Sequence, residues 1–196
     1  MIETQRTEVL APGVVVRRSF LPPAQLLALQ AALDRLAPAW QPSQTMRLLG
    51  RGTTLQVRPT DLVAQGPLDH IRRMLAPKVL EAALSAGFRF PRPPVLQLFP
   101  VRMLGDAADP AFQEPHTDSA GADAAPPMCS NVFYARVLKV SGGEIAVAAR
   151  PGAELGDDAV TLSPSANTLV SFPGDRVHAV RPLHAGERIS IVINLY

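Results

Sequence analysis

The sequence has few cysteines and no long apolar run, and each shortage excludes a class of protein. Cys129 is the only cysteine among 196 residues, so no internal disulfide can form and a reducing compartment is expected. No segment resembles a signal peptide, and none approaches the ~20 apolar residues that a membrane span requires. We therefore expect a cytoplasmic protein that has no membrane partner.

The sequence also has little excess positive charge and few aromatic residues. The formal net charge is +2, and only 5% of the residues are aromatic. Lys78 and Lys139 are the only lysines, and the arginines are scattered along the chain. A nucleic-acid surface needs a basic stripe or rings on which bases can stack. We therefore expect no nucleic-acid partner.

The character of the chain changes near Pro94. In the first half, the apolar spacing predicts a strand at 13–20, a helix at 24–37, a hairpin at 47–59 and a second helix at 67–88. Pro77 is expected to break or kink the second helix, because proline cannot donate a backbone hydrogen bond. From Pro94 onward, short runs rich in β-branched residues predict antiparallel strands at 95–104, 131–140, 143–149, 167–172, 177–180 and 188–196.

This order of elements predicts an α+β protein in which helices buttress a sandwich or barrel of strands. The length fits one domain, 1–196, which divides into an N-terminal strand and helix layer at 1–93 and a β core at 94–196.

The β half contains the stretch EPHTDSAG, in which His116 and Asp118 are two residues apart. In a strand such a pair projects from one face, so an imidazole and a carboxylate lie side by side. Two histidines and one carboxylate form the facial triad that holds Fe(II) in non-haem oxygenases. Alternatively, the pair is an ordinary loop histidine followed by a turn aspartate.

The third ligand would have to come from another part of the chain, which has four histidines. His70 lies in the second predicted helix beside charged residues, and His184 lies in a turn-like segment. His178 remains, at the start of a predicted strand, although a strand-end histidine with no metal is the simpler interpretation.

Arg188 and Ser190 follow in the last predicted strand and share one of its faces. An inward-facing arginine in an apolar strand is costly without an anion, and a guanidinium beside a hydroxyl suits a carboxylate. If the strand faces the other way, both residues are exposed and the isoleucines between them are buried.

The order of these residues resembles that of the Fe(II)- and 2-oxoglutarate-dependent dioxygenases, most closely the prolyl-4-hydroxylase-like branch. The resemblance covers about 95–196 and includes Gly142-Gly143-Glu144-Ile145, which is similar to that branch's Gly-Gly-Glu-Leu segment, and the His-x-Val-x-Pro pattern at 178–182. It implies a double-stranded β-helix, a jelly-roll or cupin-like core, and an enzyme that hydroxylates an unactivated C–H bond with release of succinate and CO2.

The resemblance also implies a site. His116, Asp118 and His178 would bind Fe(II), and 2-oxoglutarate would meet Arg188 and Ser190. O2 would be the second cosubstrate, and ascorbate is an expected reductant. Family members that halogenate have a small residue in place of the carboxylate, so the intact aspartate favours hydroxylation, although desaturation and cyclisation use the same triad.

Two departures from the family pattern leave parts of the site open. The strand before the metal motif lacks the tyrosine that usually contacts the cosubstrate, and Gln97, Phe99 or Arg102 could replace it, of which Arg102 is preferred. Asn131 and Tyr134 match the branch's Tyr-Leu-Asn segment only loosely, and they and Gln97 are candidates for the substrate pocket. Residues 104–127 are expected to form a lid, with a plain surface loop as the alternative.

Four functions therefore stay open. The first is a dioxygenase that hydroxylates a small molecule, amino-acid-like or biosynthetic, and the second is a hydroxylase of protein or peptide side chains. The third is a cupin-like protein that binds a metal or ligand without turnover. The fourth is a structural β-sandwich. Arg188 favours the enzymes, because a storage site has no evident use for a carboxylate clamp.

Overall fold

The structure is a computed structural model that describes residues 5–37, 40–42, 54–56, 67–118 and 125–196. The elements, in chain order, are β1 (Arg6–Ala11), β2 (Val14–Arg18), α1 (Pro23–Asp34), β3 (Gln41–Pro42), β4 (Thr54–Gln56), α2 (Pro67–Ser85), β5 (Leu96–Leu104), β6 (Ala111–His116), β7 (Cys129–Gly142), β8 (Ile145–Val147), β9 (Val160–Leu162), β10 (Thr168–Phe172) and β11 (His178–Leu195).

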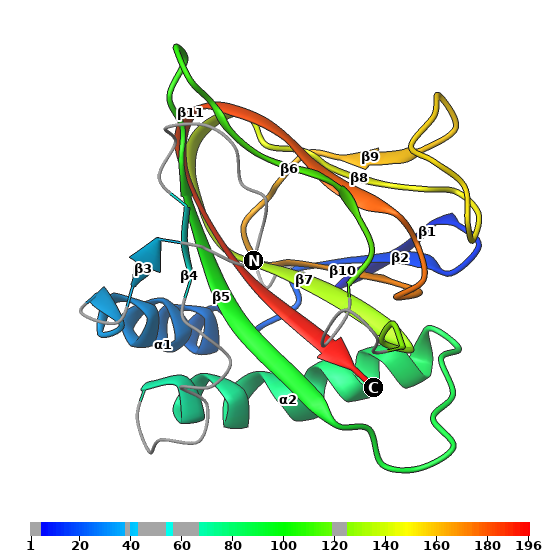
Figure 1. Ribbon diagram of the computed structural model, residues 1–196. Coiled ribbons are helices and arrows are strands. Elements are labelled where there is room, and N and C mark those ends of the chain that lie inside the picture. Colours follow the sequence, from blue (N-terminus) through cyan, green and yellow to red (C-terminus); the bar gives the residue numbers. More distant parts are fainter. Residues whose placement is uncertain (1–4, 38–39, 43–53, 57–66, 119–124) are drawn as a thin grey trace.

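The strands form a nearly closed barrel, and every pairing among the described residues is antiparallel (Figure 1). One layer follows the order β1-β2-β10-β7-β11-β5-β4-β3, while β6, β8 and β9 lie across from it and join through β11. This architecture confirms the predicted double-stranded β-helix with N-terminal helices.

Strand β11 belongs to both layers and thereby closes the barrel. Its first part pairs with β6 and β8, and its second part pairs with β5 and β7. Gly186 lies where the register shifts, at a φ of 82°, and a Cβ there would overlap the carbonyl oxygen of Leu138. The two strands predicted at 177–180 and 188–196 are therefore one long bent strand, because glycine allows the chain to turn between the layers.

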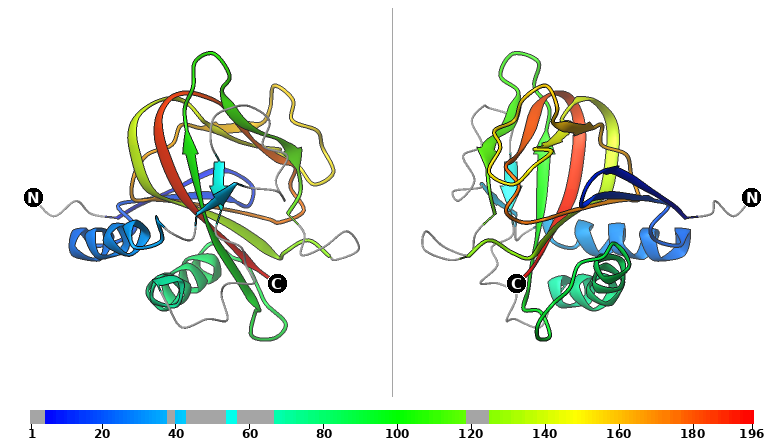
Figure 2. Two further views of the ribbon diagram at one scale, coloured as in Figure 1. Left: turned by 60° about the vertical axis from the view of Figure 1, so that its left-hand side comes forward. Right: turned by 90° about the vertical axis from the view of Figure 1, so that its right-hand side faces the viewer.

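Both helices cover the outer face of the larger layer, as Figure 2 shows. Alternate residues of β11 point toward them, so Ile189, Ile191 and Ile193 pack in one cluster with Leu29 of α1 and Leu75 of α2. The residues between those isoleucines face the barrel interior and are buried as well. The last strand therefore has both faces covered, and the alternative in which Arg188 and Ser190 are exposed is wrong.

Several boundaries differ from the sequence prediction. Strands β1, β6 and β9 were not predicted, and β6 occupies 111–116 inside the segment expected to be a lid. Helix α2 runs through Pro77 without a break, because buried residues on both sides of it, such as Leu75 and Val79, anchor the helix to the core. The predicted hairpin at 47–59 falls outside the described residues except for β4.

Neither of the described helices is long and apolar enough to cross a membrane.

Candidate metal and cosubstrate site

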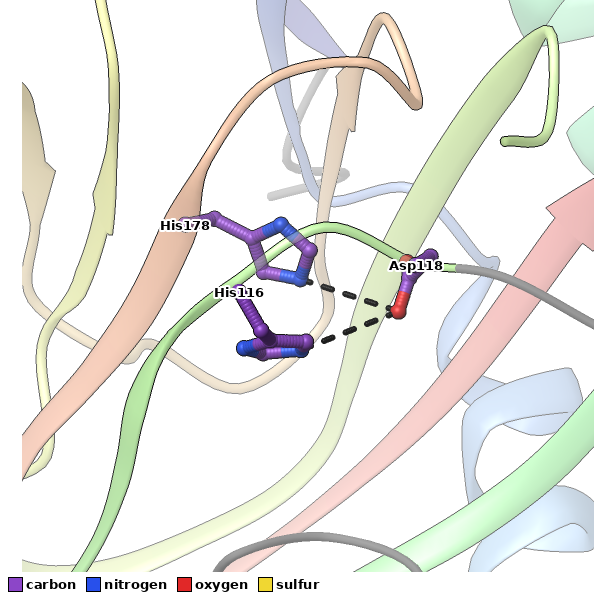
Figure 3. Close-up of side chains that lie close together, drawn as sticks. All are labelled: His116, Asp118 and His178. Atoms are coloured by element: carbon purple, nitrogen blue, oxygen red, sulfur yellow. Dashed lines mark ion pairs between the residues drawn. The ribbon is translucent and has the colours of Figure 1, made fainter. Parts of the chain in front are cut away.

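Three side chains from two distant places in the chain converge at one point (Figure 3). His116 is the last residue of β6, Asp118 follows two residues later, and His178 opens β11 directly opposite His116 in the strand register. One ligand atom from each lies within 4.8 Å of the other two. The Nε2 atoms of His116 and His178 are each 3.8 Å from Oδ1 of Asp118, so three potential ligand atoms face a common point.

Backbone carbonyl groups fix the orientation of both imidazoles. Nδ1 of His116 lies 2.8 Å from the carbonyl oxygen of Glu114, and Nδ1 of His178 lies 3.1 Å from that of Arg176. A carbonyl oxygen only accepts, so each Nδ1 donates its hydrogen and each Nε2 keeps its lone pair. A metal binds the imidazole through this lone pair on Nε2, and the hydrogen bond at Nδ1 already fixes the orientation of the ring.

Burial keeps His178 neutral. Its side chain is 5% exposed, and the ring of Phe172 lies 4.9 Å from its own ring, centroid to centroid. Burial lowers the pKa of His178, and nearby His116 lowers it further, while Asp118 raises it. A lowered pKa means that the neutral form, which binds metals, prevails at neutral pH.

Ser130 orients the carboxylate and was not identified from the sequence. Its Oγ donates to Oδ2 of Asp118 at 2.8 Å, which leaves Oδ1 for the two histidines. Ser130 is fully buried near the start of β7. The only signal in the sequence is a serine and an asparagine side by side within an otherwise apolar strand, where polar side chains need a partner.

A narrow cavity connects the three side chains to the next strands. It encloses about 30 Å³, and its polar lining consists of Gln113, His116, Asp118, Tyr134, His178, Arg188 and Ser190. Since one water needs about 10–15 Å³, the cavity has room for two or three waters. Any larger ligand would therefore require side chains at the cavity to move.

Arg188 is the buried cation of this cavity. It is 3% exposed, its Nη1 donates to the carbonyl oxygen of Gly143 at 2.7 Å, and its guanidinium carbon lies 5.5 Å from the ring centre of Tyr134. Its Nε has no hydrogen-bond partner among the described residues, nor does Oη of Tyr134. Burial lowers the pKa of Arg188 and raises that of Tyr134, so the phenol keeps its hydrogen at neutral pH.

These residues fit Fe(II) and a dicarboxylate on their own chemistry. Two imidazole nitrogens and a carboxylate oxygen around one point are the donor set of the non-haem iron triad. Arg188 and Tyr134 offer two buried donors that lack acceptors, and a carboxylate would satisfy both. The fit to a carboxylate rests on these unpaired donors, because burying such groups without an acceptor would be costly in a region that served packing alone.

Three residues predicted for the site lie elsewhere. Arg102 pairs in register with Ile189 on the helix-covered face, and its Nε donates to Glu187 at 2.6 Å. Asn131 also faces that side, with its amide donating to the carbonyl oxygen of Ile193 at 3.0 Å. Neither is among the residues that line the cavity.

Gln97 lies on the correct face but beyond the cavity. Its Oε1 is 3.4 Å from the amide nitrogen of Asn194 and 3.3 Å from the hydroxyl of Tyr196, at the end of β11. Since it does not line the cavity, the structure does not support its assignment to the substrate pocket. Tyr134 is the one predicted pocket residue that reaches the cavity.

Gln113 is a second residue that the sequence did not indicate. It lies three positions before His116 in the same strand, and its Nε2 is 2.9 Å from Nε2 of that histidine. Because the imidazole nitrogen carries the lone pair, the amide donates to the same atom that would bind a metal.

Comparison with known proteins agrees with this geometry. Residues 103–196 match the 2OG-Fe(II) oxygenase superfamily, whose members use Fe(II) and 2-oxoglutarate. None of the curated proteins compared with the chain matches its sequence.

Three solved structures are similar to this one. A prolyl-4-hydroxylase from Pseudomonas putida has a TM-score of 0.64 and 20% identity, over 93% of this chain and 91% of that one. A prolyl hydroxylase from Trichoplax adhaerens, in complex with a hypoxia inducible factor peptide fragment, has a TM-score of 0.69 and 14% identity, over 94% and 84%. A non-heme alpha ketoglutarate dependent epimerase from nogalamycin biosynthesis has a TM-score of 0.65 and 17% identity, over 93% and 78%. At these identities the likeness shows the fold.

Proposed function

Residues 103–196 belong to the 2OG-Fe(II) oxygenase superfamily, and on that premise we propose that this dioxygenase hydroxylates an unactivated C–H bond of a small molecule, with an amino-acid-like compound or a biosynthetic intermediate as substrate. The observation that carries the proposal is the convergence of His116, Asp118 and His178 at a cavity that is also lined by Arg188, a buried arginine whose Nε has no hydrogen-bond partner among the described residues.

In this proposal the three converging side chains bind the metal. His116 and His178 offer their Nε2 atoms because both Nδ1 atoms already donate to backbone carbonyls. Asp118 offers Oδ1 and supplies the one negative charge, while Ser130 holds its other oxygen. The protein fixes three ligands and leaves the remaining coordination positions to cosubstrate and O2.

Arg188 and Ser190 would bind the far carboxylate of 2-oxoglutarate. The guanidinium is anchored through Nη1 on Gly143, so its other N–H groups keep a fixed direction. Ser190 lines the same cavity and adds a hydroxyl, and the Tyr134 hydroxyl adds a further donor. A fixed fork and two hydroxyls suit a carboxylate geometrically as well as in charge.

Bound Fe(II) would let O2 oxidise 2-oxoglutarate and the C–H bond together, so that one oxygen atom enters the hydroxyl group of the product and the other enters succinate, with release of CO2. The residues of the chain bind, orient and exclude water. The apolar lining of the cavity, which includes Val101, Val132 and Val192, keeps bulk solvent from the reacting atoms. Ascorbate would act as an external reductant that restores Fe(II), with no dedicated binding residue among those described.

The alternative is hydroxylation of a protein or peptide side chain. Two of the similar structures favour it, since one is a prolyl-4-hydroxylase and another holds a peptide. The third is an epimerase of a biosynthetic pathway, which favours a small molecule and shows that the same fold serves reactions other than hydroxylation.

Anaerobic spectroscopy tests the metal and cosubstrate roles directly. Purified protein receives Fe(II) and then 2-oxoglutarate, and we expect a visible metal-to-ligand charge-transfer band. Asp118→Ala and His178→Ala should abolish the band. Arg188→Ala should weaken the binding of 2-oxoglutarate by about 1.5–3 kcal/mol, which is the contribution of a charge-assisted hydrogen bond. The affinity for Fe(II) should be retained.

Turnover then separates the substrates. On aeration, succinate release should increase with small amino-acid-like compounds more than with proline-containing peptides. Absence of both the band and succinate would overturn the enzyme assignment. Equal loss of metal and cosubstrate in Arg188→Ala would indicate misfolding instead of a cosubstrate contact. Stimulation by peptides alone would favour the alternative function.

A further inference from the structure

A polar groove lies between α2 and the strands β1 and β2, on the face of the sheet opposite the metal site. Figure 2 shows these two strands beside the helices. The groove has a volume of about 380 Å³ and is lined by Gln5, Thr7, Arg17, Phe20, Lys78, Glu81, Ala82 and Ser85. It is remote from the cavity because Arg17 pairs in register with Leu169, which packs in the cluster beneath the helices.

Arg17 is the buried charge of this groove. Its side chain is 4% exposed, and its Nη2 donates to the hydroxyl of Ser85 at 2.7 Å. Its Nη1 is buried and has no hydrogen-bond partner among the described residues. Burial lowers the pKa of Arg17, since the charged form has lost water without gaining an anionic partner among the described residues. Buried charges in proteins are normally paired, so an acceptor is missing here.

The described part of the chain supplies no counter-ion. Cys129 is the one ionisable group whose charge would favour the guanidinium, but burial raises the pKa of its thiol to about 12. It is therefore neutral at pH 7. Glu81 lines the groove, yet among the described residues no ion pair joins it to Arg17 or Lys78.

We propose that this groove binds a small oxyanion, a phosphate or carboxylate group, held between Arg17 and Lys78. The guanidinium of Arg17 offers its unpartnered Nη1, and the ammonium of Lys78 adds a point charge from the neighbouring helix. Thr7 of β1 and Gln5, which precedes that strand, add polar groups. The site depends on neither iron nor 2-oxoglutarate.

Thermal unfolding of the full chain, without iron or 2-oxoglutarate, tests the site with inorganic phosphate and with acetate. Sodium chloride at the same ionic strength is the reference. We expect Tm to rise saturably with at least one of the two anions, well above the chloride response. The anion that binds more tightly identifies the group that the site prefers.

Three variants locate the effect. Lys78→Gln should weaken the binding at least about fivefold, because one of two charge-assisted contacts is lost. Glu81→Gln should tighten it, because a competing negative charge leaves the groove. Arg73→Gln is the matched control and should leave it unchanged, since Arg73 lies on the exposed face of α2, where it pairs with Asp69.

Arg17→Gln should abolish the saturable rise, and the Lys78 and Glu81 variants keep the test decisive if that protein does not fold. A chloride-like response to both anions would overturn the proposal. So would identical responses from Lys78→Gln and Arg73→Gln, which would reveal a general salt effect. Neither result bears on the metal site, because no iron is present in the experiment.

Discussion

The guanidinium of Arg188 is held by the carbonyl oxygen of Gly143, at 2.7 Å from Nη1. Gly143 has a φ of 76°, and a Cβ there would lie 2.9 Å from Cδ1 of Leu183. The Gly-Gly pair therefore has a local physical reason: it directs a carbonyl oxygen at the cavity while the chain passes close to β11. Without that carbonyl, the buried guanidinium would lose the hydrogen bond that anchors its Nη1.

Gly143→Ala should weaken 2-oxoglutarate binding without removing the metal ligands. An alanine at positive φ costs roughly 1–2 kcal/mol, and the carbonyl oxygen would shift away from Arg188. Anaerobic titration of the Fe(II) protein with 2-oxoglutarate gives the affinity, and thermal unfolding gives the stability.

Gly152→Ala is the control for that experiment. Gly152 also has a positive φ, 67°, but nothing lies within 4 Å of its hypothetical Cβ. Both variants should lose stability through the positive φ, Gly143→Ala more so because its Cβ also meets Leu183, and only Gly143→Ala should lose cosubstrate affinity. Equal cosubstrate affinities in the two variants would contradict the anchoring role of Gly143.

Ser130→Ala should weaken Fe(II) binding by about 10–100-fold, the usual effect of removing a group that orients a metal ligand. Its hydroxyl donates to Oδ2 of Asp118, so the variant frees that carboxylate to rotate. Ser171→Ala is the matched control, because Ser171 is equally buried and donates to Oδ1 of Asn131 at 2.7 Å. Isothermal titration with Fe(II) under anaerobic conditions distinguishes them, and equal losses would show that Ser130 acts only on stability.

Cys129 should be unreactive toward thiol reagents in the folded protein. Burial raises its pKa to about 12, so the thiolate, which is the reactive form, is nearly absent at pH 8 and appears only as the pH approaches that value. Reaction with a chromogenic disulfide at pH 8 should therefore be slow until denaturant unfolds the chain, where an ordinary thiol pKa of about 8.5 returns. Rapid reaction of the native protein would contradict the burial of Cys129.

The convergence of His116, Asp118 and His178 and the inward direction of Arg188 could be predicted from the family resemblance, which matches the order of these residues along the chain. The strand period places Arg188 on the same face as Ser190, but it does not say which face is inward or which strands lie opposite. Arg102 could not be placed in the same way. A strand's period of two does not say which face is inward, and the partner register decides it: Arg102 lies opposite Ile189, while its neighbours Val101 and Met103 line the cavity.

Tyr134 and Gln113 show the same limit for residues that reach the cavity. Tyr134 is paired with Ser190 across the β7–β11 ladder, and that pairing turns it inward. Gln113 lies in β6, within a segment rich in Gly, Ala, Asp and Pro, and that composition concealed the strand. Long-range pairing, which no local pattern encodes, decided both positions.

The amide of Gln113 and the metal compete for Nε2 of His116. Removing this amide should therefore raise the affinity for Fe(II) instead of lowering it. Its amide nitrogen lies 2.9 Å from Nε2 of His116, whose lone pair would bind Fe(II). Metal binding must therefore break this hydrogen bond and turn the amide away, which also widens a cavity that has room for only two or three waters.

Gln113→Ala should consequently bind Fe(II) more tightly than the unaltered protein. A hydrogen bond of this kind is worth about 0.5–1.5 kcal/mol, which corresponds to a gain of roughly two- to tenfold in affinity. Gln97→Ala removes the same side chain from a place outside the cavity and should leave Fe(II) affinity unchanged. Anaerobic Fe(II) titration measures both. Weaker binding in Gln113→Ala would mean that the amide supports His116 as a ligand, because a group that only competes with the metal cannot lower its affinity when it is removed.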